Sequence, residues 1–270
     1  MNIARLRLIV VLIMVFSSDV LISQNKDLKP FNLNFNREAV IFGSGSIATV
    51  TAFVLLENIK PFTPEEISLL DPGVVNSFDR KTIGPYKEDY LGDALLYTSY
   101  LIPVSFVAYG RTRADILDLA LIYGEVLLLQ SSINGIIKGA VQRTRPFVYD
   151  DESPIDKKTT TDARISFFSG HTSMTTAISF FTAKVFSEYI EDDKVKILIW
   201  SGAVILPSVV SISRVETNWH FPTDVITGYI VGALIGYFIP ELHKSKLSSD
   251  ISVYPSMNLN KPALSLQINF

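Results

Sequence analysis

The chain has 270 residues, of which 48% are hydrophobic and 19% are charged, a size that suits one domain with at most a short appendage. Its formal net charge of -3 gives no global basic field and argues against nucleic acid as a partner. The sequence has no cysteine, which excludes disulfides and thiolate chemistry, and only three histidines. We therefore expect neither a metal nor another cofactor.

Residues 1–23 have the form of an export signal. Arg5 and Arg7 precede an uncharged run over residues 8–16, and small and polar residues follow. Because no clear Ala-x-Ala cleavage site is present, an uncleaved membrane anchor is the alternative. Either form addresses the chain to a bacterial cell envelope.

Apolar segments predict six helices, over residues 39–59, 90–109, 114–138, 168–189, 195–213 and 222–243. Most have a charge-free core of about 16 to 19 residues, at the lower edge of the length that spans a bilayer. The first helix belongs to a polar N-terminal region, residues 24–89, in which residues 60–89 are expected to form a cap. The other five form the expected core, residues 90–243.

Two carboxylates interrupt the third of these helices. Asp118 and Glu125 lie inside its apolar run. In a membrane such side chains face the interior of the bundle and a partner, whereas on a soluble helix they are solvated. Both readings stay open at this point.

The hydrophobic periodicity changes in the C-terminal tail, residues 244–270. Apolar and polar residues alternate from Leu264 to Phe270, and residues 260–262 are suited to turn a preceding strand, residues 251–259, back on this one. The predicted fold class is therefore all-α: a six-helix bundle, embedded in the membrane, with a short C-terminal β-hairpin.

A first block of cations lies at the end of the third helix. Lys138 and Arg145 are seven residues apart, which is two helical turns, so they are expected to project from one face. Pro146 disfavours helix at Arg145 and ends the element there. Arg143 lies off that face and is expected to point to solvent or lipid headgroups. Alone, such cations are usual at the ends of membrane helices.

The second block, residues 169–171, opens the fourth helix. Ser169 is a good N-cap, and Gly170 lets an anion approach the backbone N–H groups. The helix dipole adds to this attraction. His171 is then placed to donate a proton to a leaving oxygen. Alone, a Ser-Gly-His sequence is common as ordinary helix capping.

The third block joins the last two helices. Arg214 ends one of them, and Pro222 suits the first turn of the next, which places Asp224 in that turn. Asp224 is therefore able to reach a nitrogen of His220 and leave the other nitrogen free as a nucleophile. Alone, the block is more often a packed histidine with a capping aspartate than a catalytic pair.

Together the blocks Lys-x6-Arg-Pro, Ser-Gly-His and Ser-Arg-x5-His-x3-Asp resemble the signature of the type 2 phosphatidic acid phosphatase and vanadium haloperoxidase superfamily, in its bacterial membrane lipid phosphatase branch. The resemblance covers about residues 90–243 and implies a helical bundle. It implies that the phosphate is bound by Lys138, Arg145, Arg214, Ser169 and Gly170.

The resemblance also implies the catalytic roles. His220 attacks phosphorus to give a phosphohistidine, His171 protonates the departing alcohol, Asp224 orients His220, and no metal takes part. One position departs from the family pattern, because Phe168 replaces the usual proline before Ser-Gly-His. Phenylalanine lacks the fixed φ of proline, so packing must hold the start of this helix.

The expected function is hydrolysis of a phosphate monoester or pyrophosphate of a membrane lipid, such as phosphatidic acid, phosphatidylglycerol phosphate, a polyprenyl pyrophosphate or a lipid A phosphate. A soluble periplasmic acid phosphatase, a vanadium-dependent haloperoxidase and a non-catalytic bundle that binds a phosphorylated headgroup are the alternatives. The sequence does not indicate the oligomeric state.

The sequence gives two conflicting indications of the membrane orientation. A cleaved signal followed by three crossings would leave Lys138 inside, whereas Arg111 and Arg113 indicate a cytoplasmic loop that places it outside. The two agree if residues 39–59 do not cross or if the whole bundle lies outside. We expect an integral membrane bundle with its site facing the periplasm.

Overall fold

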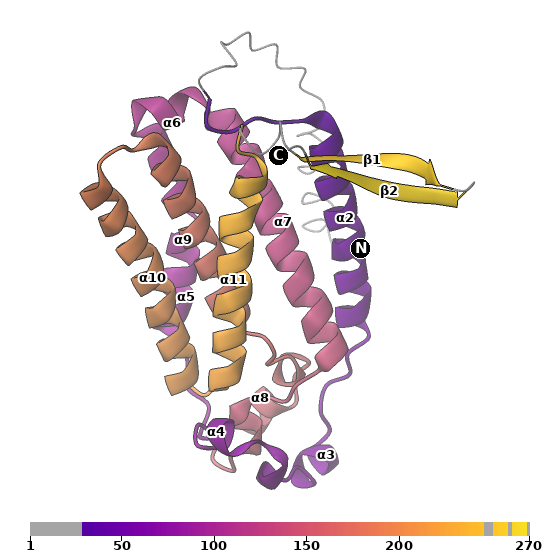
Figure 1. The fold of residues 1–270 in the computed structure, drawn as a ribbon. Helices are drawn as coiled ribbons and strands as arrows, with labels where there is room; N and C mark the ends of the chain where they lie inside the picture. The colour runs from indigo at the N-terminus through magenta and orange to yellow at the C-terminus, as the bar shows by residue number, and fades with distance from the viewer. Residues whose placement is uncertain (1–28, 246–250, 259–260, 269–270) are drawn as a thin grey trace, which may run out of the picture.

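The computed structural model describes residues 29–245, 251–258 and 261–268. The expected export signal, residues 1–23, lies outside the described residues. Figure 1 shows helices running side by side, with short helices gathered at one end.

Four long helices are apolar enough to cross a membrane: α2 (Phe35–Glu57), α7 (Ile116–Val141), α10 (Asp193–Glu216) and α11 (Pro222–Leu242). Their outer faces carry exposed apolar side chains, among them Ile47 on α2, Ile205 on α10 and Leu234 on α11. Large apolar surfaces of this kind mark contact with lipid or with another protein. Together with the length of the helices they indicate an integral membrane protein.

The expectation of six helices is wrong at one of them, the second. The segment expected to be helical over residues 90–109 divides into α5 (Tyr90–Ser99) and a 3-10 helix, η4 (Ile102–Val107), because Pro103 cannot continue the hydrogen-bond ladder of α5. A short helix, α6 (Gly110–Ala114), then leads into α7. The fourth expected helix, α9 (Gly170–Tyr189), is long but rich in Ser and Thr, and most of its residues are buried among the other helices.

Close packing joins α9 to α11. Gly228, Gly232 and Gly236 of α11 lie on one stripe that faces the backbone of α9. A Cβ atom at Gly228 would lie 2.7 Å from the carbonyl oxygen of Ser169, and one at Gly232 or Gly236 would lie even closer to a carbonyl oxygen. Small residues therefore let the two backbones approach closely, as is common between membrane helices.

A cap of short elements covers one end of the bundle, at the bottom of Figure 1. It consists of α3 (Pro64–Ser68), η3 (Pro72–Val74), α4 (Ser77–Arg80), η5 (Pro146–Tyr149), α8 (Ile155–Lys158) and η6 (Asp162–Arg164). Its small apolar core contains Phe62 and Phe147. Thr63 and Glu66 form a reciprocal capping box that begins α3. The cap thus brings residues 60–89 and 146–166 together.

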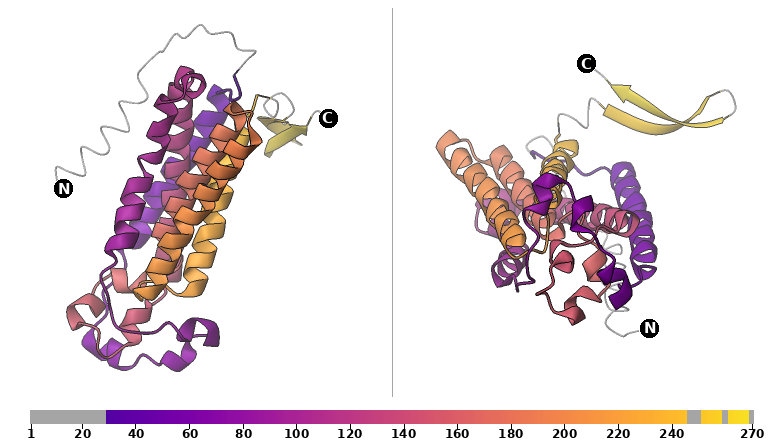
Figure 2. Two further views of the ribbon diagram at one scale, coloured as in Figure 1. Left: turned by 90° about the vertical axis from the view of Figure 1, so that its left-hand side faces the viewer. Right: turned by 90° about the horizontal axis from the view of Figure 1, so that it is seen from below.

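The C-terminal segment forms two antiparallel strands, β1 (Ile251–Asn258) and β2 (Lys261–Ile268), with Ile251 opposite Ile268 and Asn258 opposite Lys261. Both views in Figure 2 show this hairpin beside the bundle rather than within it. The rest of the described fold is helical.

Candidate active site

The three motif blocks meet at the capped end of the bundle. There the end of α7, the start of α9 and the junction of α10 with α11 surround a cavity of about 300 Å³. The cavity is lined by Asp93, Tyr97, Lys138, Arg145, Asp162, His171, Arg214, Trp219 and His220. Five predicted site residues therefore line one cavity.

The geometry that brings Lys138 and Arg145 together differs from the prediction. Helix α7 ends at Val141, and Gln142 takes a left-handed conformation with φ of 47°. Arg145 therefore does not share a helical face with Lys138. The chain instead turns at Gln142, and Arg145 is fixed in an extended conformation before Pro146.

Each cation has polar partners around the cavity. Lys138 Nζ donates to the carbonyl oxygen of Ile165 at 2.9 Å. Arg145 Nη2 lies 2.8 Å from Asp162 Oδ1, and Arg214 Nη1 lies 3.0 Å from Asp89 Oδ2. Both guanidinium groups are almost fully buried. Paired in this way, the cations are preorganised to bind an anion.

Trp219 contacts both arginines. The guanidinium carbon of Arg145 lies 4.9 Å from the centroid of the Trp219 ring, and that of Arg214 lies 4.7 Å from it. Cation–π attraction stabilises guanidinium groups against an indole. Trp219 therefore offsets part of the repulsion between two buried positive charges.

Asp162 contributes a negative charge at the cavity wall. Burial by itself would raise the pKa of its carboxyl group, but the nearby Arg145 and Lys138 lower that pKa below its ordinary value. Asp162 therefore stays ionised and holds the Arg145 side chain in place.

His220 is completely buried, and its two ring nitrogens have different surroundings. Arg145 Nη1 donates to His220 Nε2 at 3.0 Å, so Nε2 keeps its lone pair and Nδ1 carries the proton. Nδ1 faces Asp224 Oδ2 at 3.7 Å, which is longer than a hydrogen bond. Burial, followed by the charges of Arg145 and Lys138, lowers the pKa of His220 well below its ordinary value. The ring is therefore neutral at neutral pH.

Asp224 is held by three donors. Ser166 Oγ donates to its Oδ2 at 2.5 Å, the backbone N–H of Phe221 donates to the same oxygen at 2.9 Å, and Arg143 Nη1 lies 2.5 Å from Oδ1. The carboxylate is fully buried. Its position is therefore fixed by the surrounding structure rather than by His220.

The prediction that Arg143 faces solvent or headgroups is wrong. After the turn at Gln142 its side chain points inward, where Nη2 lies 2.7 Å from Asp79 Oδ2 while Nη1 binds Asp224. Burial would raise the pKa of Asp79, but hydrogen bonds from Thr223 and Arg143 lower it. Arg143 therefore links the cap to the start of α11.

The start of α9 is built as the sequence predicts. Ser169 is the N-cap and its Oγ accepts from the backbone N–H of Thr172 at 3.4 Å. A Cβ atom at Gly170 would lie 3.0 Å from Asn134 Oδ1, so glycine leaves room at this point. Phe168 is 2% exposed, and its carbonyl oxygen accepts from Asn134 Nδ2 at 2.9 Å. Packing and this hydrogen bond hold the segment that proline holds elsewhere in the family pattern.

His171 has a carboxylate partner that sequence reasoning missed. Its Nε2 lies 2.8 Å from Asp93 Oδ1 of α5, and the same oxygen lies 3.3 Å from Arg214 Nη1. Burial is the main cause, and Arg214 the next, of a pKa of His171 lowered to about 4, although Asp93 opposes this shift. In the free protein the ring is therefore neutral at pH 7.

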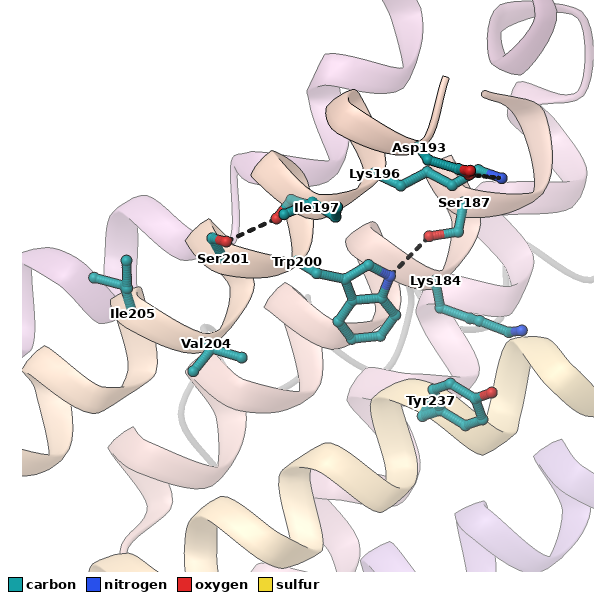
Figure 3. Close-up of a pocket in the computed structure, with 10 residues that line it drawn as sticks. All are labelled: Lys184, Ser187, Asp193, Lys196, Ile197, Trp200, Ser201, Val204, Ile205 and Tyr237. Atoms are coloured by element: carbon teal, nitrogen blue, oxygen red, sulfur yellow. Dashed lines mark hydrogen bonds and ion pairs between the residues drawn. The ribbon is translucent and has the colours of Figure 1, made fainter. Parts of the chain in front are cut away.

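A second and larger pocket, of about 1020 Å³, lies between α9, α10 and α11 (Figure 3). Its walls include Lys184, Trp200 and Tyr237, and Trp200 Nε1 donates to Ser187 Oγ at 2.9 Å. It contains no residue of the three motif blocks, so it is separate from the candidate active site.

All three motif blocks lie within a match to a known protein family. The PAP2 superfamily model matches residues 119–247, which contain all three motif blocks. Over 168 residues the chain is 31% identical to the probable lipid phosphate phosphatase 4 of Arabidopsis thaliana, a match that covers 51% of this chain and 53% of the plant protein. The chain thus spans about half the length of this curated relative.

Among solved structures, the chain resembles the crystal structure of the first transmembrane PAP2 type phosphatidylglycerolphosphate phosphatase from Bacillus subtilis, with a TM-score of 0.42 and 20% sequence identity. That match covers 77% of this chain and 92% of the other. The family resemblance drawn from the sequence is confirmed by the family match. Residues 119–247 of this chain match the PAP2 superfamily model.

Proposed function

We propose that this protein is a phosphatase that hydrolyses a phosphate monoester or pyrophosphate of a membrane lipid through a phosphohistidine intermediate. The observation that supports it best is the convergence of three cations and two histidines on one cavity of about 300 Å³. A space of this size suits a phosphate-bearing headgroup, because pockets for whole drug-sized molecules run from about 300 to 1,000 Å³.

In this proposal the phosphate oxygens bind Lys138, Arg145 and Arg214. The hydroxyl of Ser169 and the backbone N–H of Gly170, at the positive end of the α9 dipole, add further donors. These groups stabilise the negative charge of the transition state by preorganised electrostatics. The proposed reaction therefore uses no metal.

His220 Nε2 is the proposed nucleophile. It attacks phosphorus as the bond to the leaving oxygen breaks, and His171 gives that oxygen a proton. Water then attacks the phosphohistidine, His171 takes a proton from the water, and inorganic phosphate leaves. When phosphate oxygens bind Arg145, its guanidinium group releases Nε2 for the attack.

Asp224 and Asp93 have positioning roles in this mechanism. Asp224 stabilises the Nδ1 proton of His220, so that Nε2 stays a lone-pair donor. Asp93 holds one nitrogen of His171 and favours its protonated form. Arg143 fixes Asp224.

The membrane setting supports a lipid substrate. Two of the four candidate spans, α7 and α10, contribute Lys138 and Arg214 to the cavity, and the plant relative is named as a probable lipid phosphate phosphatase. We propose the same division of the chain as the sequence suggests: an export signal or anchor (residues 1–23), an N-terminal region (24–89), the phosphatase core (90–243) and a C-terminal tail (244–270). We also propose that the cavity faces the periplasm.

A phosphate-release panel tests the activity. The detergent-purified protein is offered phosphatidic acid, phosphatidylglycerol phosphate, a polyprenyl pyrophosphate, a lipid A phosphate and a soluble aryl phosphate, with His220→Ala as the blank. We expect release from at least one lipid and none above background in the blank. Equal release by His220→Ala would contradict the proposal, and a preference for the soluble ester would instead favour an acid phosphatase. Vanadate-dependent bromide oxidation would favour a haloperoxidase.

Orientation is testable because the chain contains no cysteine. Single cysteines are introduced at exposed positions at the two ends of the bundle, Ser68→Cys in the cap and Lys194→Cys at the start of α10. A maleimide that cannot cross the inner membrane is expected to label the first variant in intact spheroplasts and not the second. The reverse labelling pattern would place the site in the cytoplasm.

A further inference from the structure

A second group of buried ionisable side chains lies at the opposite end of the bundle from the active site. Glu38 is in the first turns of α2, Glu125 is in α7, and His243 caps the C-terminus of α11. Figure 1 shows the start of α2 and the end of α11 far from the cap. Glu125 and His243 are 0% exposed and Glu38 is 8% exposed. Nothing in the proposed phosphatase mechanism uses these residues.

The ring of His243 presents one nitrogen to both carboxylates. Its Nδ1 lies 2.7 Å from the carbonyl oxygen of Ile239, which accepts only, so Nδ1 carries a proton. Its Nε2 lies 3.1 Å from Glu125 Oε2 and 3.4 Å from Glu38 Oε1. In the neutral ring Nε2 therefore directs a lone pair at two carboxylate oxygens.

Several of these atoms have no hydrogen-bond partner within the part of the chain that the structure describes. They are Nε2 of His243, both carboxylate oxygens of Glu125, and Oε2 of Glu38. Buried polar atoms normally have partners, and leaving a charged one without any is costly. These four unpaired atoms lie within one cluster, which points to a missing ligand that accepts lone pairs.

The net charge of the cluster also indicates a bound cation. Arg37 Nη2 lies 2.7 Å from Glu38 Oε1 and balances one of the two carboxylates. With a neutral His243 the buried cluster keeps one negative charge. A second proton on His243 would also compensate it, but no contact of Nε2 with either carboxylate has the geometry of a hydrogen bond. Binding of a cation requires only that lone pairs converge on one point, and this cluster provides such a point.

We propose that Glu38, Glu125 and His243 form a structural binding site for a divalent transition-metal ion, with Zn²⁺ as the expected occupant. Ligand atoms bound to zinc at about 2.0–2.1 Å in tetrahedral geometry lie about 3.3–3.4 Å apart, close to the distances from Nε2. One ligand atom from each residue fits within 4.8 Å of the others. Imidazole with carboxylates suits Zn²⁺, whereas Mg²⁺ and Ca²⁺ prefer oxygen ligands alone.

The site would join three helices that meet at this end. Glu38 belongs to α2, whose packing in the bundle is mainly against α7, and His243 follows α11. A metal bound between them would cross-link α2, α7 and the end of α11. Its expected effect is on stability, and it does not depend on the proposed phosphatase activity.

Metal analysis tests the proposal directly. Detergent-purified wild-type protein is stripped with EDTA, equilibrated with Zn²⁺, freed of excess metal and assayed by mass spectrometry. We expect about one zinc per chain in the wild type and less than about 0.2 in His243→Asn and in Glu125→Gln, because each variant loses one of three protein ligands. His171→Asn is the matched control and is expected to keep about one zinc per chain, because it removes a histidine outside the cluster.

Thermal unfolding gives a second readout. Zn²⁺ is expected to raise the melting temperature of the wild type and not that of Glu125→Gln. Wild-type protein with less than about 0.1 zinc per chain would overturn the proposal and leave an ion pair between His243 and Glu125, because a structural site binds zinc tightly. Equal zinc content in wild type and His243→Asn would overturn it as well. If one variant does not fold, the wild-type stoichiometry and the other variant still decide.

Discussion

Replacement of Arg143 by methionine tests how the active site is held. The guanidinium group is 23% exposed and binds two carboxylates, Asp79 and Asp224, that are 0% exposed. Methionine keeps much of the apolar volume but leaves both carboxylates without their counter-charge. Breaking a buried ion pair by removing one partner costs about 3–5 kcal/mol.

The remaining contacts place the expected cost at the lower end of that range. Asp79 keeps donors from Asn76 and from Thr223, and Asp224 keeps those from Ser166 and Phe221. Partial exposure of Arg143 also allows water to replace some of its charge. We therefore expect Arg143→Met to lower the free energy of unfolding by about 3 kcal/mol.

The kinetic effect separates positioning from binding. Arg143 does not line the cavity, so Arg143→Met leaves the three phosphate-binding cations in place and KM nearly unchanged. Asp224 loses its anchor, and kcat is expected to fall about 10–100-fold, less than the ~10⁴-fold effect of losing the carboxylate of a catalytic triad outright.

The assay combines denaturant titration in detergent micelles with steady-state phosphate release. Arg111→Met is the control, because Arg111 pairs with Glu191 in an exposed salt bridge, and we expect it to leave both measurements unchanged. Wild-type stability and wild-type kcat in Arg143→Met would refute the reasoning. A raised KM with unchanged kcat would show that Arg143 binds substrate instead.

Three further predictions follow from the site and the packing. Because the pKa of His171 is lowered to about 4, its ring is neutral at pH 7 in the free protein, and the second proton, which it passes to the leaving oxygen, must arrive with the substrate monoanion. We expect kcat/KM to fall as pH rises above about 6, the second pKa of a phosphate ester, and a profile that rises to pH 8 would contradict this. Asp93→Asn removes a charge that raises the pKa of His171, so kcat at pH 6 is expected to fall about 10-fold; an unchanged kcat at this pH would exclude the role of Asp93. Gly232→Val forces a branched side chain against the backbone of α9 and is expected to cost about 3 kcal/mol of unfolding free energy. Gly202→Val, where a Cβ atom meets nothing within 4 Å, is its control; equal stability of the two variants would refute the packing argument.

The sequence predicts much of the helical framework because hydrophobic runs and capping residues are local signals. The bounds of α2, α9 and α11 lie within a few residues of those expected. The end of α7 was missed by three residues, because the left-handed turn at Gln142 has no glycine to mark it. The division of residues 90–109 depends on Pro103, whose effect the apolar run concealed.

The candidate site, too, could be predicted only where its residues carry a local sequence signal. Its motif residues converge because they lie at helix ends, which the sequence indicates. Asp93 and Asp162 were missed because nothing in their local sequence shows that α5 and the cap fold over the cavity. Arg143 was placed wrongly by extending helical periodicity beyond the end of the helix. Trp219 was detectable only as the neighbour of His220.

Trapping the phosphoenzyme tests the central claim most directly. Protein is mixed with a lipid substrate labelled with ³²P at its phosphate, stopped with denaturant at high pH, and digested for mass spectrometry. We predict label that is stable in alkali and labile in acid, located on His220, and absent from His220→Ala. Phosphate release by wild-type protein with label on no residue, or on a residue other than His220, would contradict the account.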